Sequence, residues 1–172
     1  MAEIRTGQVI DALVSSLRVL PGFRAPSDRD FAPNTTVWDG PEYAIVEDHA
    51  PGAHLIIGWG GDGAVASPAA DTTWSSGPIA GRVHPREETT LISCMAVRDR
   101  MDTPKEARDS VLEAVTAVAQ LCRANPGLGI DTSQTIGGVS TLAWVTGGNL
   151  VQYVERGFSA MQAFTVTYKT RV

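Results

Sequence analysis

The chain has 172 residues, of which 43% are apolar and 19% charged, values typical of one globular domain. Its formal net charge of −5 disfavours a general nucleic-acid-binding surface, and no apolar run approaches the roughly 20 residues that span a bilayer. The first residues lack the apolar core of a signal peptide, so we expect synthesis in a cytoplasm, with Cys94 and Cys122 as free thiols.

The N-terminal third predicts one helix and several short strands. Apolar residues recur with helical spacing at 5–20, and Pro21 with Gly22 ends this pattern, so we expect an amphipathic helix. The charged, proline-containing segment 23–34 predicts a surface loop. Segments typical of strands follow at 35–38, 43–46 and 54–59. The last of them is continuously apolar, which predicts burial on both faces of a sheet.

The segment from Gly60 to Pro78 contains few large apolar side chains. Because few apolar contacts offset the entropy of ordering it, we predict a mobile loop that becomes ordered against a neighbouring chain. Trp74 in this loop either folds back onto the domain or contacts a partner, and the sequence leaves both alternatives open. The remaining tryptophans lie on predicted strands, where we expect core positions: Trp38, Trp59 and Trp144.

The stretch 103–125 is the most regular in the chain. Thr103 is a suitable N-cap, Pro104 suits the first helical position, and Glu106 completes a capping box with Thr103. The sequence Asn-Pro-Gly that begins at Asn125 ends the helix. Apolar residues form one stripe, at Ala107, Val111, Ala114, Val115, Val118, Leu121 and Cys122. We expect Val111, Val115 and Val118 to face a sheet.

Further extended segments complete the predicted sheet, at 79–83, 89–98, 139–146, 150–155 and 160–172. The segment 89–98 is apolar on both faces and leads directly into the helix, which predicts a central strand. Gly147 and Gly148 predict a two-residue hairpin turn, and Arg156 with Gly157 predicts another turn or a bulge. One face of 160–172 becomes polar toward its end, which is typical of an edge strand or an emerging tail.

This order of elements predicts an α+β fold. We expect a mostly antiparallel sheet with two amphipathic helices packed on one face. No linker or internal repeat divides the chain, so residues 1–172 are predicted to form a single domain.

The run from Gly58 to Gly63 fits the pattern G-x-G-x-x-G and follows a predicted strand. A dinucleotide site would also need a helix that opens at the last glycine, because N–H groups at a helix N-terminus hold the pyrophosphate. Pro68 and the lack of a helical period favour a flexible glycine turn instead. A small-molecule-binding domain that uses this loop remains an alternative.

No motif predicts catalysis, and we expect neither an enzyme nor a cofactor or metal ligand. The chain lacks a G-x-S-x-G nucleophile elbow, and His49, His54 and His84 are scattered. The cluster Glu47, Asp48 and His49 consists of adjacent residues, which point to opposite sides of an extended chain. At most two of them could bind one ion, so a solvated acidic turn is the favoured interpretation.

Short phrases along nearly the whole chain resemble the tail terminator proteins of long-tailed bacteriophages and related prophages. The phrases are Leu20-Pro21-Gly22, Val37-Trp38-Asp39-Gly40-Pro41, Leu55-Ile56-Ile57-Gly58, the strand from Glu87 to Val97, Ala107-Arg108, Ala124-Asn125-Pro126-Gly127-Leu128-Gly129, Gly157-Phe158-Ser159 and the closing Arg171. The resemblance rests on these phrases and on the order of elements, because the chain has no diagnostic catalytic motif.

The resemblance implies a structural virion protein, assembled in the cytoplasm of a host bacterium and located at the head–tail junction. Such proteins form a ring, usually a hexamer, that caps the tail tube, ends its polymerisation and offers a surface to the head-completion protein. DNA passes through the ring without specific binding, which suits an acidic chain. Neither a cofactor nor a membrane is implied.

A ring built by head-to-tail contacts needs two different complementary surfaces on each subunit, and the edges of the sheet are candidates for one of them. We expect partner contacts at Trp74, Arg82, Lys169 and Arg171. The main alternative is another head–tail connector or a tube subunit of the same virion, because tube subunits share a related plan of sheet and helices.

Overall fold

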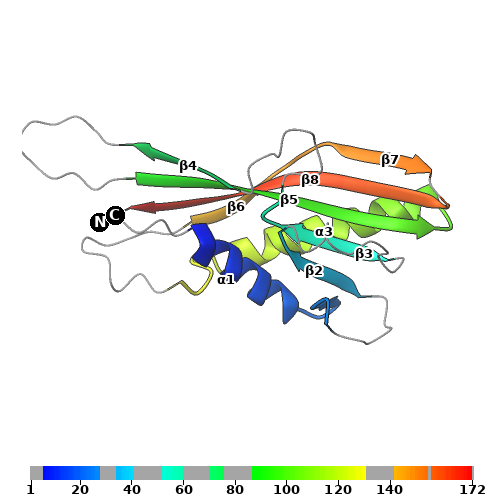
Figure 1. Ribbon diagram of the computed structural model, residues 1–172, viewed down its shortest axis with the longest axis horizontal. Helices are drawn as coiled ribbons and strands as arrows, with labels where there is room; N and C mark the ends of the chain where they lie inside the picture. Colours follow the sequence, from blue (N-terminus) through cyan, green and yellow to red (C-terminus); the bar gives the residue numbers. More distant parts are fainter. Residues whose placement is uncertain are drawn as a thin grey trace, which may run out of the picture.

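The computed structural model describes residues 6–27, 34–40, 52–59, 70–75, 87–130, 142–154 and 156–171. This part of the chain forms two helices and an eight-stranded sheet, so the fold is α+β as predicted (Figure 1). The elements are α1 (Thr6–Arg18), β1 (Phe23–Arg24), β2 (Thr35–Asp39), β3 (Ala53–Ile57), β4 (Ala70–Ser75), β5 (Glu87–Met101), α3 (Pro104–Ala124), β6 (Leu142–Thr146), β7 (Leu150–Val154) and β8 (Phe158–Arg171). Neither described helix is both long and apolar enough to cross a membrane.

Two long antiparallel strands, β5 and β8, run through the middle of the sheet. Their register extends from Glu87 opposite Arg171 to Arg98 opposite Ala160. β3 and β4 lie one after the other along the second side of β5, and β6 and β7 do the same along β8. We call the end with strands β1-β2-β3-β5-β8-β7 the body, and the end with strands β4-β5-β8-β6 the arm.

The sheet is mixed, which corrects the expectation of a mostly antiparallel one. β1 pairs with β2 in parallel, and so does β2 with β3, from Thr35 opposite Ala53 to Asp39 opposite Ile57. The other described pairings are antiparallel. Parallel neighbours require the chain to cross back to its starting end between the strands. The pattern of apolar and polar residues within each strand does not indicate such a crossover. The extended segment predicted at 43–46, between β2 and β3, lies outside the described residues.

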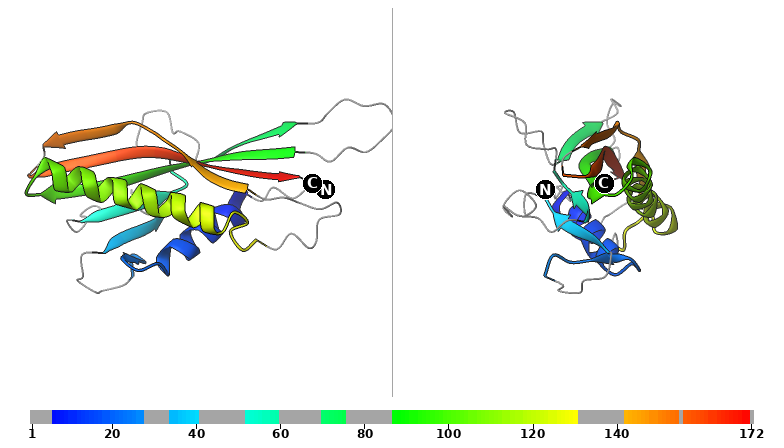
Figure 2. Two further views of the ribbon diagram at one scale, coloured as in Figure 1. Left: turned by 180° about the vertical axis from the view of Figure 1, so that it is seen from behind. Right: turned by 90° about the vertical axis from the view of Figure 1, so that its right-hand side faces the viewer.

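Both helices cover the same face of the sheet, as expected (Figure 2). Their apolar stripes pack against one face of the central strands and form the main core. Its larger members are Val9, Leu13, Leu17, Val37, Leu55, Ile57, Ile92, Val111, Val118, Phe164, Val166 and Tyr168. Val111 and Val118 are buried as predicted, whereas Val115 is only partly buried. Each fully buried side chain of this size contributes about 1.5–3 kcal/mol.

The ends of the helices are held by specific hydrogen bonds. Thr103 caps α3 as predicted, because its Oγ1 accepts a hydrogen bond from the Glu106 N–H at 3.2 Å. Asn125 ends the helix. At the end of α1, the Arg18 guanidinium donates to the Val37 carbonyl oxygen at 3.1 and 3.2 Å, which ties this helix to β2.

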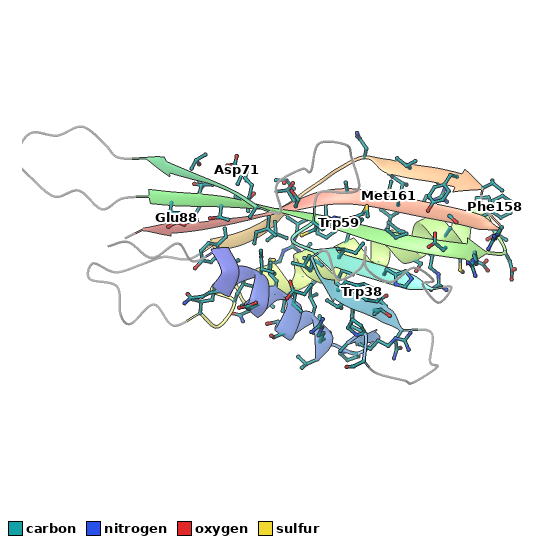
Figure 3. The ribbon with its side chains drawn as sticks, viewed as in Figure 1. Trp38, Trp59, Asp71, Glu88, Phe158 and Met161 are labelled. Carbon is teal, nitrogen blue, oxygen red and sulfur yellow. The ribbon has the colours of Figure 1, made fainter. Side chains whose placement is uncertain are left out.

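A second apolar cluster covers the opposite face of the body. It contains Trp38, Ile56 and Val97, with Trp59, Met95 and Met161 packed against them. The Trp38 indole N–H donates to Nδ1 of His54 at 3.1 Å, so His54 is a buried structural residue. Figure 3 shows Trp38, Trp59 and Met161 on the body and Asp71 with Glu88 on the arm. The core position predicted for Trp38 is confirmed, while Trp59 is half-buried.

Three further expectations were wrong in part. Residues 70–75 form β4, although the whole segment 60–78 was predicted as a loop; 60–69 and 76–78 lie outside the described residues. β8 is not an edge strand, because β5 flanks it on one side and β6 with β7 on the other. Gly147 and Gly148 do not form a hairpin turn, because β6 and β7 run in the same direction along β8.

The turn predicted at Arg156 and Gly157 is confirmed. The residues have φ angles of 53° and 130°, and they join β7 to β8 with Val154 opposite Phe158. A Cβ on Gly157 would also approach the Cα of Arg100 to 3.0 Å. Both the backbone angle and the close neighbour therefore require glycine at this position.

Candidate functional site

Three of the four predicted contact residues lie on the arm. Trp74 belongs to β4, opposite Glu88, while Lys169 and Arg171 belong to the end of β8. The pairing of β5 with both β4 and β8 thus brings together positions that are about a hundred residues apart in sequence. Arg82, the fourth residue, lies outside the described part of the chain, as does the predicted strand at 79–83.

The arm is built by threonine-rich strands. Thr73 of β4 lies opposite Thr89 of β5, and its hydroxyl donates to the Thr89 carbonyl oxygen at 3.5 Å. β-Branched residues favour the pleated surface, and threonines can also exchange hydrogen bonds across it. Thr90, Glu88 and Tyr168 are buried, whereas Asp71 and Thr73 are exposed. The arm therefore has one covered face and one accessible polar edge, along β4.

The arm projects beyond the ends of both helices (Figures 1 and 2). β5 and β8 are 15 and 14 residues long, against an average strand of about 5–6 residues. The helix-covered core reaches the base of the arm, where Ile92, Val145 and Val166 belong to it or pack against it. The ends of β4, β5 and β8 extend beyond the helices and form the projecting part of the arm (Figure 1).

The outer strand of the body, β7, is the most apolar exposed element. Six large apolar side chains are exposed in the described part of the chain, and β7 contributes three of them. They are Leu150, Val151 and Val154, with exposed fractions of 37%, 45% and 74%. β7 contains no charged residue and no proline. Natural edge strands usually carry such residues to prevent pairing with other chains, so β7 has the character of a binding edge.

The outer strands on both sides of the sheet are interrupted where the body meets the arm. On one side the Ser93 carbonyl oxygen accepts the N–H groups of Gly58 and Trp59, at 2.9 and 3.0 Å. On the other side, residues 147–149 pass along β8 between β6 and β7. A groove of about 320 Å³ lies between the two interruptions. Its lining includes Trp59, Ser93, Met95, Gly148, Ala163 and Thr165.

Gly58 has a structural role at this junction. Its φ angle is 79°, which favours glycine, and a Cβ there would meet the Cδ1 atom of Ile10 at 3.2 Å. The glycine therefore allows α1 to pack closely against the end of β3. The rest of the glycine pattern, 60–63, lies outside the described residues.

Both cysteines are free, as predicted, and both are buried. Burial raises the pKa of the Cys94 thiol to about 12 and that of the Cys122 thiol to about 11. Both thiols are thus protonated near neutral pH and pack as small apolar groups. In the described ranges no group of three or more His, Cys, Asp or Glu could hold a metal ion. His49 and His84, with Glu47 and Asp48, fall outside those ranges.

No protein-family model matches the chain, and no curated protein matches it. The resemblance to tail terminators therefore remains a prediction from the sequence. The exposed edge of β7 was not among the contact sites predicted from the sequence. A signal for it existed, because the strand Leu-Val-Gln-Tyr-Val is free of charge and follows directly on a glycine pair and an asparagine.

Proposed function

We propose that the protein is a structural virion component of the tail terminator type. Six copies form a ring that caps the tail tube, ends its polymerisation and presents a surface to the head-completion protein. The sequence phrases that resemble terminators support the class of protein. The proposed location is the head–tail junction of the virion, with assembly in the cytoplasm of the host.

The arm is the single observation that carries this proposal. A head-to-tail ring requires two different surfaces on one subunit, far enough apart to meet two neighbours. The arm provides a polar strand edge at β4, well separated from the helix-covered body (Figure 1). Trp74, Lys169 and Arg171 lie on it, so the expected contact residues share one projection.

A tube subunit or another connector of the same virion is the second candidate. The mixed sheet with two helices on one face and open strand edges would suit it as well. The two functions differ in how assembly ends. A tube subunit recreates its binding surface at every addition and grows without limit, whereas a terminator binds the end of a tube once.

Electron microscopy of the purified protein, alone and mixed with tail tubes, tests the proposal. We expect a closed ring seated on one end of each tube. Open-ended polymers of the protein alone would identify a tube subunit. If no ring is found on assembled virions, the proposal is wrong.

A charge change on the arm tests whether this surface makes the ring contact. Asp71 and Thr73 are exposed on β4, so Asp71→Arg with Thr73→Arg should leave the fold intact. The variant should lose the ring and the capping of tubes. Val19→Asp is the matched control, because Val19 is 80% exposed at the end of α1, remote from the arm. If the Arg variant forms rings of unchanged stability, the arm does not make the ring contact.

A further inference from the structure

The outer edge of β7 is a surface built for pairing with another strand. Among the described residues, β8 is the only strand that pairs with β7, so its second backbone edge faces outward (Figure 1). Residues Leu150 and Val154 lie on the face that carries the helices, and Val151 lies on the opposite face. Apolar side chains therefore flank this open edge on both faces of the sheet.

The order of side chains along β7 is nearly symmetric about its centre, Gln152. We propose that two copies of the chain pair through β7 in antiparallel register about Gln152, as one continuous sheet with a twofold axis. In this register Leu150 lies opposite Val154 of the second copy, and Val151 lies opposite Tyr153. The two Gln152 residues lie opposite each other.

This register brings like chemistry together at every position. Leu150 and Val154 are the exposed apolar residues of one face, and each covers the other across the new pairing. On the second face, an aromatic ring meets a β-branched residue, a cross-strand pair that contributes about 0.2–1 kcal/mol. No charge is brought against a like charge, because the strand has none. Self-complementarity of this kind favours a second copy over an unrelated strand.

The contact is small. Five residues on each side bury less than the roughly 1,000 Å² expected of a stable interface, so the dimer should dissociate on dilution. The hydrogen bond from Gln152 Nε2 to the Pro104 carbonyl oxygen, at 3.0 Å, holds the central side chain in place before pairing. Tyr153 is also fixed, because its hydroxyl donates to Asp99 at 3.1 Å. Little side-chain conformational freedom is therefore lost on association.

The twofold pairing describes the free protein and does not depend on the proposed ring. A twofold contact closes on itself, so it cannot relate the subunits of a ring with two different faces. The β7 contact is therefore a different contact from those that close such a ring. The β7 pairing and the ring are independent of each other, so a result that excludes one leaves the other standing.

Cross-linking of a single introduced cysteine tests the register. Opposed residues of antiparallel strands have Cα atoms about 4.5–5.5 Å apart, within the range of a disulfide. Gln152→Cys should thus form a disulfide-linked dimer under mild oxidation, while the buried Cys94 and Cys122 do not react. Leu112→Cys is the matched control, because Leu112 is 41% exposed on α3, away from β7, and should stay monomeric.

Sedimentation of variants without introduced cysteines provides the second measurement. The natural chain should show a concentration-dependent dimer, and Val154→Lys should weaken it by roughly tenfold or more, because a lysine on an edge strand blocks pairing. Val19→Lys, a charge on an exposed site of α1, should leave it unchanged. A chain that stays monomeric at all concentrations overturns the proposal. So does a dimer that survives Val154→Lys, and so does the absence of a disulfide-linked dimer in Gln152→Cys. None of these results bears on whether a ring caps tails.

Discussion

Gly148 offers the sharpest test of the sheet as described. It lies in the three-residue link between β6 and β7, directly against β8. A Cβ at this position would overlap the Ala163 carbonyl oxygen and approach the Phe164 nitrogen to 3.2 Å. These are backbone atoms in the centre of the sheet, so no flexible side chain can move aside. Gly148→Ala therefore forces the link away from β8.

The expected cost follows from this geometry. Overpacking of a well-filled site costs about 1–3 kcal/mol, and each backbone hydrogen bond lost from the adjoining ladders adds about 1 kcal/mol. We expect Gly148→Ala to lower the free energy of unfolding by about 2–4 kcal/mol. Gly147→Ala is the matched control, because a Cβ there meets nothing within 4 Å. It should change stability by no more than about 0.5–1 kcal/mol.

Urea denaturation followed by circular dichroism measures both variants. The midpoint for Gly148→Ala should fall well below that for Gly147→Ala, with similar slopes. Equal midpoints would show that residues 147–149 do not approach β8. In that case β6 and β7 would not form one interrupted edge, and the hairpin predicted from the sequence would regain support.

Three further predictions concern the helices and the core. Thr103→Ala should destabilise the protein by about 1 kcal/mol through loss of the N-cap. Thr116→Ala, exposed in the middle of α3, should instead be neutral or slightly stabilising, because alanine favours the helix, and equal midpoints for the two variants would contradict the cap. Val118→Asp should prevent folding because it buries a charge, whereas Leu112→Asp on the exposed side should fold, and soluble Val118→Asp with an unchanged Tm would contradict the helix phase. The raised pKa values of Cys94 and Cys122 stabilise the folded state below pH 9, and this contribution should be lost as the pH rises toward 11–12. Cys94→Ala with Cys122→Ala should reduce that loss, measured as unfolding free energy against pH; an identical slope would contradict it.

Elements with strong local signals could be predicted from the sequence. α3 has an N-cap threonine, a proline at its start and one apolar stripe, and all these features act within the helix itself. β3 is buried on both faces, and its continuous apolar run indicated this. β5 is central as predicted, but only its helix-covered face is fully buried, because Leu91 on the other face is 40% exposed. The turn at Arg156 and Gly157 was also predictable, because glycine tolerates the backbone angle that this connection requires.

Features set by distant contacts could not be predicted in the same way. β4 is polar, and only its pairing with β5 makes it a strand. Gly147 and Gly148 read locally as a hairpin turn, yet glycine is needed at 148 because the chain passes close to β8. The parallel pairing of β2 with β3 depends on a crossover rather than on either strand. Likewise, Trp74, Lys169 and Arg171 were named singly, and only the long ladder of β5 and β8 places them on one arm.

Tail length in a phage that lacks this gene tests the proposed function most directly. Tube growth adds identical subunits at an open end, and only a protein that binds the end without recreating it can stop this growth. Without a terminator, full heads should accumulate beside unattached tails of abnormal and variable length. Attached tails of normal length in the deletion would contradict the terminator role. Heads that leak DNA beside free tails of normal length would instead identify a head-completion protein.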